Sequence, residues 1–405
     1  MFRLTAALLA LGWINAVHAQ QYPDCLELIN NYRPDTRVTS HLPLDLDIRD
    51  IDEEIDNGNW TGAIAIYSNG KNAPGRGGAG LRNLRSYSLN AGTNYAGMPV
   101  FEVFRAYWDS ATYADDFIMA AAQGTGDFAG ANDYVRAESM VKGIQYQAVW
   151  AHVIRELEQA VDDCEETSNA NITSYEGVHS LDEAWAIYSG SLEKTNGTGG
   201  GYMLWAGAQK RCAQFGTCGS DRKAIVNKEI LGYLAQAQAL IRQGRCASAA
   251  VAIKKIIQLM VVPLIQGTLR YVHRGSTNAG WSGTTTNFQK ERGEGWAFTA
   301  AILPLVHNCS AAVALRLKNN MFFKASPFMN DGAETVVREL QSVYPCLGIS
   351  CKDVGTMKEG SNVIYEACTD PVNIVGGSQG SSAMTSALGS FIAIFATIAV
   401  WMVAL

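Results

Sequence analysis

The chain has 405 residues, 48% of them hydrophobic and 17% charged, so it can bury a large core in one or two domains. Its formal net charge is −6 and it has no basic block, which argues against nucleic acid as a partner. Apolar residues recur at three- and four-residue steps, and no series of alternating strands with hairpin turns stands out. We therefore predict an all-α fold, a disulfide-stapled helical bundle of two packed sub-bundles.

Residues 1–19 have the pattern of a secretory signal peptide. Arg3 supplies the positive start, residues 4–17 the apolar core, and Val17-His18-Ala19 the small-x-small cleavage site. The mature chain is therefore predicted to be exported to a compartment where disulfides form.

Nine cysteines follow the signal peptide, and none has the spacing of zinc ligands, so a disulfide framework is the better interpretation. Cys212 with Cys218, and Cys346 with Cys351, would close short local loops. The odd count leaves one cysteine unassigned. Four sequons for N-glycosylation fit a secreted glycoprotein: Asn59, Asn171, Asn196 and Asn308.

Helical patterns dominate the chain after a polar, glycine-rich stretch at Asn69–Asn94, which is predicted to be a long loop. Pro263 is expected to kink the long apolar helix that contains it. The segments predicted as helices are Leu46–Tyr67, Val100–Ala122, Ala131–Cys164, Leu181–Glu193, Met203–Gln214, Val226–Arg242, Cys246–Tyr271, Gly293–Val306, Ala311–Phe322 and Gly332–Tyr344.

One of these helices shows a capping signal and has a counterpart later in the chain. Ser180 followed by Glu183 has capping-box spacing, so the helix is predicted to begin at Ser180 with Glu183 in its first turn. Arg292–Phe298 repeats the order acid, small, Trp, Ala and large apolar 111 residues later, with Glu294 equivalent to Glu183.

The same offset aligns Tyr146–Leu157 with Ile257–Thr268, one apolar helix with another. Two matching blocks at one offset favour an internal duplication, although apolar helices can also align by chance. We therefore divide the chain into the signal peptide (1–19), a first helical half (20–220), a second helical half (221–372) and a C-terminal segment (373–405).

The C-terminal segment combines small polar residues at Gly376–Ser382 with an uncharged apolar stretch at Ala387–Leu405. This order fits a GPI-attachment signal better than a retained membrane span, because no basic residues follow the apolar stretch. With either interpretation, the tail provides the membrane contact. We expect the protein at the outer face of the plasma membrane or in the periplasmic space.

Enzyme motifs are missing from the sequence. It contains no nucleophile elbow, P-loop, dinucleotide fingerprint or zinc-protease helix motif, so we expect a protein that is not an enzyme. His152 and Glu156, four residues apart on one helix, could share a metal ion, but such a pair is more often a helix-surface contact.

Oxygen donors are plentiful in stretches that mix aromatic and acidic residues. Ferric iron is a hard cation that prefers carboxylate and phenolate oxygens, and a nearby arginine could hold a carbonate that completes its shell. We expect Glu183 and Glu294 to approach each other across the repeat. The alternative is that these side chains only cap and solvate helices. The predicted metal ligands are Glu183, Glu294, Tyr188, Tyr271, Tyr113 and Asp116, and the predicted anion-binding residues are Arg270 and Arg274.

Several segments resemble the algal iron-assimilating proteins, which include the low-iron-induced surface proteins called phytotransferrins. They are MVVPLIQGTLRYVHR (260–274), EGWAFTAAILPLVHNCSAAVA (294–314), VYPCLGISCKDVG (343–355), YADDFIMAA (113–121) and DEAWAIYSGSLE (182–193). The resemblance covers most of the mature chain. It implies an extracellular protein that captures ferric iron for uptake, with carbonate as a candidate second ligand. It leaves open which reductase or endocytic partner would receive the iron.

Two other classes of function compete with iron binding. An extracellular structural or adhesion glycoprotein could use a helical repeat only to present surface. A secreted enzyme could assemble its site from residues that are distant in sequence. A visible charge-transfer band with ferric iron would separate an iron-binding protein from a scaffold.

Overall fold

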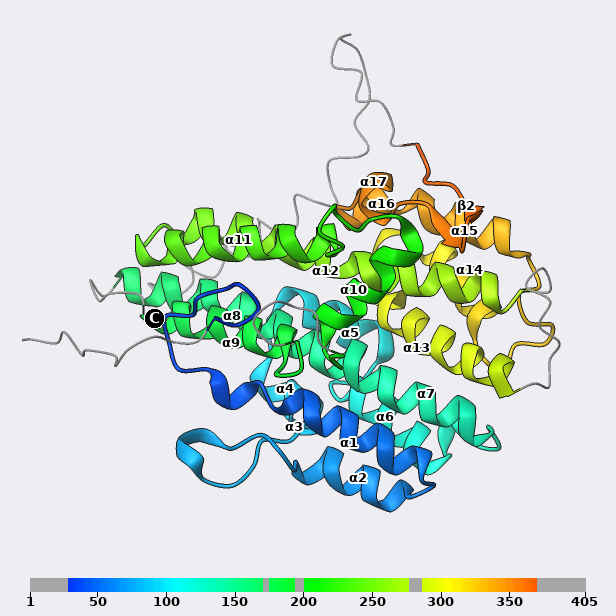
Figure 1. Cartoon of the computed structure of the whole chain (residues 1–405), viewed down its shortest axis with the longest axis horizontal. Coiled ribbons are helices and arrows are strands. Elements are labelled where there is room, and N and C mark those ends of the chain that lie inside the picture. The colour runs from blue at the N-terminus through cyan, green and yellow to red at the C-terminus, as the bar shows by residue number, and fades with distance from the viewer. Residues whose placement is uncertain (1–27, 170–174, 194–199, 277–285, 370–405) are drawn as a thin grey trace, which may run out of the picture.

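The computed structural model describes residues 28–169, 175–193, 200–276 and 286–369, and these residues form an all-α fold with one small β-hairpin (Figure 1). In Figure 1, α11 and α12 run along one side of the molecule and α1 and α2 along the opposite side, with α8, α9, α10 and α13 between them. The predicted all-α, disulfide-stapled bundle is confirmed.

The chain up to residue 169 forms short helices and then one long helical run. The predicted loop at Asn69–Asn94 ends in two short helices, and the predicted helix Val100–Ala122 is two helices, because Asp109 has a left-handed φ of 51° and ends the first. The predicted run Ala131–Cys164 is helical from Asp133 onward, with a π-helical stretch in its middle. The elements are η1 (Thr39–His41), α1 (Leu44–Asp56), α2 (Trp60–Asn69), η2 (Arg76–Gly78), α3 (Ser86–Leu89), α4 (Ala91–Asn94), α5 (Pro99–Trp108), α6 (Tyr113–Gln123), η3 (Gly126–Phe128), α7 (Asp133–Gly143), η4 (Ile144–Val149) and α8 (Trp150–Asn169).

The rest of the chain contains the longest helices and the hairpin. α12 continues through Pro263 without a break, and β1 pairs antiparallel with β2. The elements are α9 (Tyr175–Ser189), α10 (Leu204–Phe215), α11 (Ile225–Arg242), α12 (Cys246–Arg274), α13 (Thr286–Cys309), α14 (Ala311–Met321), α15 (Ala333–Ser342), α16 (Tyr344–Leu347), α17 (Cys351–Val354), β1 (Met357–Glu359) and β2 (Asn362–Tyr365).

The buried apolar residues form one continuous cluster from Ile29 to Met357. Among the described residues, α12 is the one helix long and apolar enough to cross a membrane, but most of its apolar stretch is buried inside the protein. It is the central core helix, in contact with α8, α10, α11 and α13. The division into two halves stays a prediction. The largest side chains that are almost fully buried are Trp150, Trp185, Trp205 and Trp296.

Four disulfides form among the described residues, and one of the two predicted local pairs is wrong. Cys212–Cys218 forms as expected, but Cys346 pairs with Cys309 rather than with Cys351. The reason is spatial: Cys346 in α16 lies beside the end of α13, while Cys351 in α17 meets the chain after the hairpin. The remaining bonds are Cys164–Cys246 and Cys351–Cys368.

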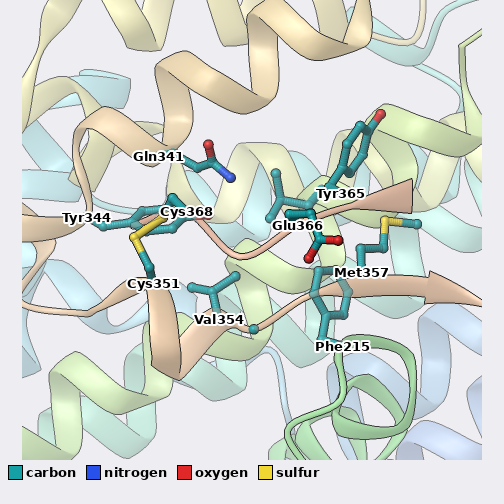
Figure 2. A pocket seen from close by; sticks show the side chains of 11 residues that line it. Phe215, Gln341, Tyr344, Cys351, Val354, Met357, Tyr365, Glu366 and Cys368 are labelled. Carbon is teal, nitrogen blue, oxygen red and sulfur yellow. A yellow bond between two sulfur atoms is a disulfide. The ribbon is translucent and has the colours of Figure 1, made fainter. Parts of the chain in front are cut away.

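A cavity beside the last disulfide is too small to be a ligand site. Figure 2 shows Cys351–Cys368 next to Tyr344, with Tyr365 and Met357 of the hairpin nearby. The volume is about 10 Å³, enough for a single water molecule. Clusters of polar side chains are the other candidates for a functional site.

Several predicted features lie outside the described residues: the signal peptide, the C-terminal segment 373–405, Cys25 as the ninth cysteine, and the sequons at Asn171 and Asn196. Of the other two sequons, Asn59 is exposed and accepts a hydrogen bond from Gly62 at the start of α2. Asn308 is exposed near the end of α13. Glycosylation stays a prediction.

Candidate functional site

The two carboxylates that we expected to meet have separate sets of partners. Glu183 lies next to His41 and His179, and Glu294 lies next to Tyr271 and Lys142. No hydrogen bond or ion pair between the described parts of α9 and α13 joins Glu183 to Glu294. The structure therefore presents two polar clusters, and whether either binds a metal stays a prediction.

The first group, which we call the Glu183 cluster, consists of His41, His152, Glu156, His179 and Glu183, with Tyr87 against it. One oxygen of Glu183 lies 3.0 Å from Nε2 of His41 and 3.1 Å from Nε2 of His179. The His41 side chain is only 3% exposed, whereas that of His179 is 42% exposed. The cluster is therefore buried on one side and open to solvent on the other.

His179 was not among the predicted site residues, because the predicted start of α9 at Ser180 was too late. The helix begins by Tyr175, so Ser180 is inside it, and its hydroxyl donates to Asp163 on α8 instead of capping the helix. His179 and Glu183 are then four residues apart on one helix face, where side chains meet. The predicted capping box at Ser180 is wrong.

Two buried aspartates bring His41 to α9. Asp182 accepts hydrogen bonds from Tyr32, from the backbone of Asp35 and from Thr36, which fixes the segment before η1. Asp45, just after η1, accepts bonds from residues 191 and 192 that follow α9. Burying a carboxylate is costly unless hydrogen bonds satisfy it, so these two residues specify how the N-terminal segment lies on α9.

The hydrogen bonds around His179 define which of its two ring nitrogens is available to a metal ion. The hydroxyl of Thr36 donates to Asp182, so it accepts from Nδ1 of His179, 2.9 Å away. Nε2 therefore faces Glu183, and it is the nitrogen that could bind a metal ion. A hydrogen bond to Glu183 raises the pKa of His179, which favours the imidazolium in the free protein.

Charge is balanced within the cluster. Burial alone would raise the pKa of Glu183, but hydrogen bonds from His179 and His41 outweigh it and hold that pKa well below its usual range. Burial raises the pKa of Glu156 to about 7, although Arg155 lies 2.6 Å away and opposes the shift. Burial lowers the pKa of His152 well below its usual value, so this imidazole is neutral.

Several buried polar atoms at this cluster have no hydrogen-bond partner among the described residues. Nδ1 of His41, one oxygen of Glu156 and the hydroxyl of Tyr87 are in this group, together with Nε of Arg82 and of Arg155. Buried polar groups are nearly always paired, so these atoms are available to water or to a ligand, as are Nε of Arg270 and one oxygen of Glu291 near Glu294. His152, by contrast, is fully engaged, with Tyr95 on Nδ1 at 2.9 Å and Glu156 near Nε2 at 3.4 Å.

The second group, the Glu294 cluster, consists of Glu138, Lys142, Tyr271, Glu291 and Glu294. The Tyr271 hydroxyl donates to Glu294, and burial together with Glu294 raises the pKa of this phenol well above its usual value. Lys142 lies 3.9 Å from Glu294, so a cation of the protein already faces the carboxylate. Burial and Glu294 raise the pKa of Glu138 to about 7.

The other predicted site residues do not join either cluster as a group. Tyr188 is buried and donates to Asn227, and Tyr113 is buried against Phe104. Asp116 accepts from Ser110 and Thr112 at the start of α6. Tyr113 and Asp116 thus face different surroundings.

The predicted anion-binding residues lie beside the Glu294 cluster. Arg274 pairs with Glu359 at 2.9 Å and faces Glu291 at 3.8 Å. Arg270 lies against the Tyr271 ring. Carboxylates thus already face Arg274, and binding of an anion there stays a prediction.

As the side chains stand, no group of three or more His, Cys, Asp and Glu residues in the described ranges is arranged to hold a metal ion. The spacing in the Glu183 cluster is nevertheless compatible with one. Two ligand atoms at right angles, each about 2.1 Å from an ion, lie about 3 Å apart. The two imidazole-to-carboxylate distances have this value.

Comparison with known proteins gives one match. The model of a family described as low iron-inducible periplasmic protein matches residues 3–374 of the chain. No curated protein and no solved structure matches it. The matched range contains both the Glu183 and the Glu294 clusters.

Proposed function

The chain belongs to the family of low iron-inducible periplasmic proteins, and from this membership and the Glu183 cluster we propose that it binds ferric iron as cargo for iron assimilation. The protein follows the secretory pathway to the periplasm or the cell surface. There it would act as a binding protein and not as an enzyme.

The observation that carries the proposal is one carboxylate oxygen shared by two imidazole nitrogens, at 3.0 and 3.1 Å, beside solvent. Two histidines and one carboxylate on a common face are a recurrent ligand set for non-haem Fe(II), and further hard oxygen ligands would suit the ferric ion. Thr36 and Asp182 hold His179 from behind, as outer-shell partners commonly do for a metal-binding histidine. Glu156 offers a further carboxylate oxygen with no partner among the described residues.

Binding requires the hydrogen bonds of Glu183 to be exchanged for bonds to the ion. The protons on Nε2 of His179 and on Nε2 of His41 must both leave these nitrogens, and Glu183 rotates from its imidazole partners toward the ion. Since the carboxylate is already ionised, the imidazoles are the groups that give up protons, and the unpartnered Nδ1 of His41 can take one up. This movement accounts for the absence of a ready-made ligand group.

A carbonate that completes the shell at the Glu183 cluster would bind at Arg82, because the predicted residues Arg270 and Arg274 lie beside the Glu294 cluster. Arg82 has no carboxylate within ion-pair distance among the described residues, and its Nε is buried without a partner. It is also among the charges that act on His152 and on Tyr87. A guanidinium there could bind a planar anion that also contacts the ion.

The test is titration of the purified extracellular chain with ferric iron, with and without bicarbonate, in three forms. We expect the wild-type chain to bind, and Glu183→Gln to lose more than about 100-fold in affinity, beyond the 10- to 100-fold typical of outer-shell changes. Glu294→Gln is the matched control, because it removes the equivalent charge of the predicted repeat, and it should bind like wild type.

Two results would contradict the proposal in different ways. Loss of binding in Glu294→Gln alone would move the site to the Glu294 cluster, with Tyr271 as a ligand. Failure of the wild-type chain to bind ferric iron with bicarbonate present would favour a structural or adhesion protein.

A further inference from the structure

We propose that Tyr87 is a phenolate ligand of the Glu183 cluster and that it gives the site its preference for Fe³⁺ over divalent ions. This inference rests on the proposed function, because it adds a ligand to that same site. It concerns a residue in α3, a segment without any functional signal in its sequence.

The ring of Tyr87 is fixed against the cluster. It stacks on the imidazole of His152 with a centroid distance of 3.6 Å and an interplanar angle of 20°. The residue is 8% exposed. His152 in turn lies one helical turn from Glu156 on α8, so the stacked ring belongs to the buried side of the cluster.

The hydroxyl of Tyr87 is the feature that needs a partner. It is buried and has no hydrogen-bond partner among the described residues. The charged groups that act on it most strongly are Arg82, Glu156 and Glu183. These are groups that we assign to the ion and the anion, and a buried donor without an acceptor is costly to the fold.

Among the other buried tyrosines in the described ranges, Tyr344 also has a hydroxyl without a partner, but it lies beside the Cys351–Cys368 disulfide and not at the Glu183 cluster. The hydroxyl of Tyr95, which contacts the same imidazole, forms a hydrogen bond with Nδ1 of His152 at 2.9 Å. Four more buried tyrosines each donate to a side-chain oxygen of Asp or Glu or, in one case, Asn: Tyr32, Tyr67, Tyr188 and Tyr271.

The chemistry follows from the charges. On binding, the phenol O–H bond breaks, an Fe–O bond forms, and the proton leaves to water. Burial raises the pKa of Tyr87 well above its usual value, so the phenol stays protonated until a cation compensates the phenolate. A trivalent ion compensates it better than a divalent ion, and a hard phenolate oxygen suits Fe³⁺.

Tyr87→Phe and the matched control Tyr95→Phe test the assignment. Phenylalanine keeps the ring stack on His152, so we expect both variants to fold with wild-type circular dichroism. Each is titrated with Fe³⁺ and, separately, with Zn²⁺, while the visible phenolate-to-iron band and the amount of bound metal are measured.

We expect a visible band in the wild-type chain and in Tyr95→Phe, and no band in Tyr87→Phe. The last variant should still bind iron, with its affinity for Fe³⁺ lowered about 100-fold and that for Zn²⁺ little changed. Resonance Raman phenolate modes in the iron-loaded wild-type chain provide a second measurement that needs no variant.

The outcomes separate this inference from the function on which it rests. A band that persists in Tyr87→Phe, or iron bound by the wild-type chain without any phenolate band, overturns the role of Tyr87 and leaves the Glu183 site standing. A wild-type chain that binds no iron overturns both.

Discussion

At the scale of single residues, the position of each proton controls what the Glu183 cluster can bind. The lowered pKa of Glu183 keeps this carboxylate ionised in mildly acidic solution. The pKa of His179 is raised, and that of Glu156 is raised to about 7, so both groups take up protons as the pH falls from 8 to 5. His152 stays neutral over the same range.

We therefore predict that affinity for ferric iron falls as the pH drops toward 5. A proton on Nε2 of His179 occupies the lone pair that the ion needs. A protonated Glu156 is neutral and no longer compensates the positive charge of the ion. The dissociation constant is measured against a competing chelator at several pH values. His179→Gln, which cannot take up this proton, should give a weaker but flatter profile. A wild-type affinity that is constant from pH 8 to 5 would contradict the assignment of His179.

The individual ligands show how far sequence reasoning could reach. Glu183 was found because an acid beside an apolar helix face stands out. His41 was missed because it lies in a single turn without periodicity, and Tyr87 because its segment resembled a loop. Tyr188 was assigned as a ligand since it shares the helix with Glu183, but five residues rotate it by about 140° around the helix, so it points into the core, to Asn227.

At the scale of elements, α9 presents a polar face to the cluster and an apolar face to the core. Trp185 lies on the apolar face, 1% exposed, and its indole N–H donates to Ile29. Its ring contacts Tyr32, Tyr188 and Trp205. This one side chain thus connects the N-terminal segment, α9 and α10.

We predict that Trp185→Ala lowers the free energy of unfolding by about 3–5 kcal/mol, the usual cost of truncating a large buried aromatic side chain. Chemical denaturation with the disulfides intact measures it. Trp185→Phe, which keeps most of the ring, should lose clearly less. A loss below about 1 kcal/mol for the alanine variant would show that the site repacks easily.

Two contacts between helix pairs are equivalent under the 111-residue offset of the predicted duplication. Ser180 on α9 donates to Asp163 on α8 at 2.8 Å, and 111 residues later Glu291 on α13 faces Arg274 on α12 at 3.8 Å. The ring partners of the equivalent tryptophans differ, since Trp296 contacts Phe322. The duplication therefore stays a prediction, which superposition of α8–α9 on α12–α13 would test.

At the scale of the whole molecule, the Glu183 cluster joins segments that are far apart in the chain. His41 comes from η1, Tyr87 from α3, Glu156 from α8 and Glu183 from α9. Helical periodicity and the cysteine and signal patterns were enough to predict the fold class and the compartment. They could not predict this meeting, because nothing in a periodic pattern specifies which distant segments approach each other.

The ion would connect four segments. We therefore predict that iron slows amide exchange in the segment around η1, residues 36–42, and in the segment around α3, residues 82–89. A ligand that binds only the folded state adds about 2.7 kcal/mol at 100 times its dissociation constant, and segments that open locally gain protection first. Hydrogen–deuterium exchange with and without ferric iron measures this. Glu183→Gln should show no iron-dependent change, Glu294→Gln should respond like wild type, and the hairpin at 357–365 should be unaffected in all three. Protection confined to residues 270–274 and 290–294 would instead place the ion at the Glu294 cluster.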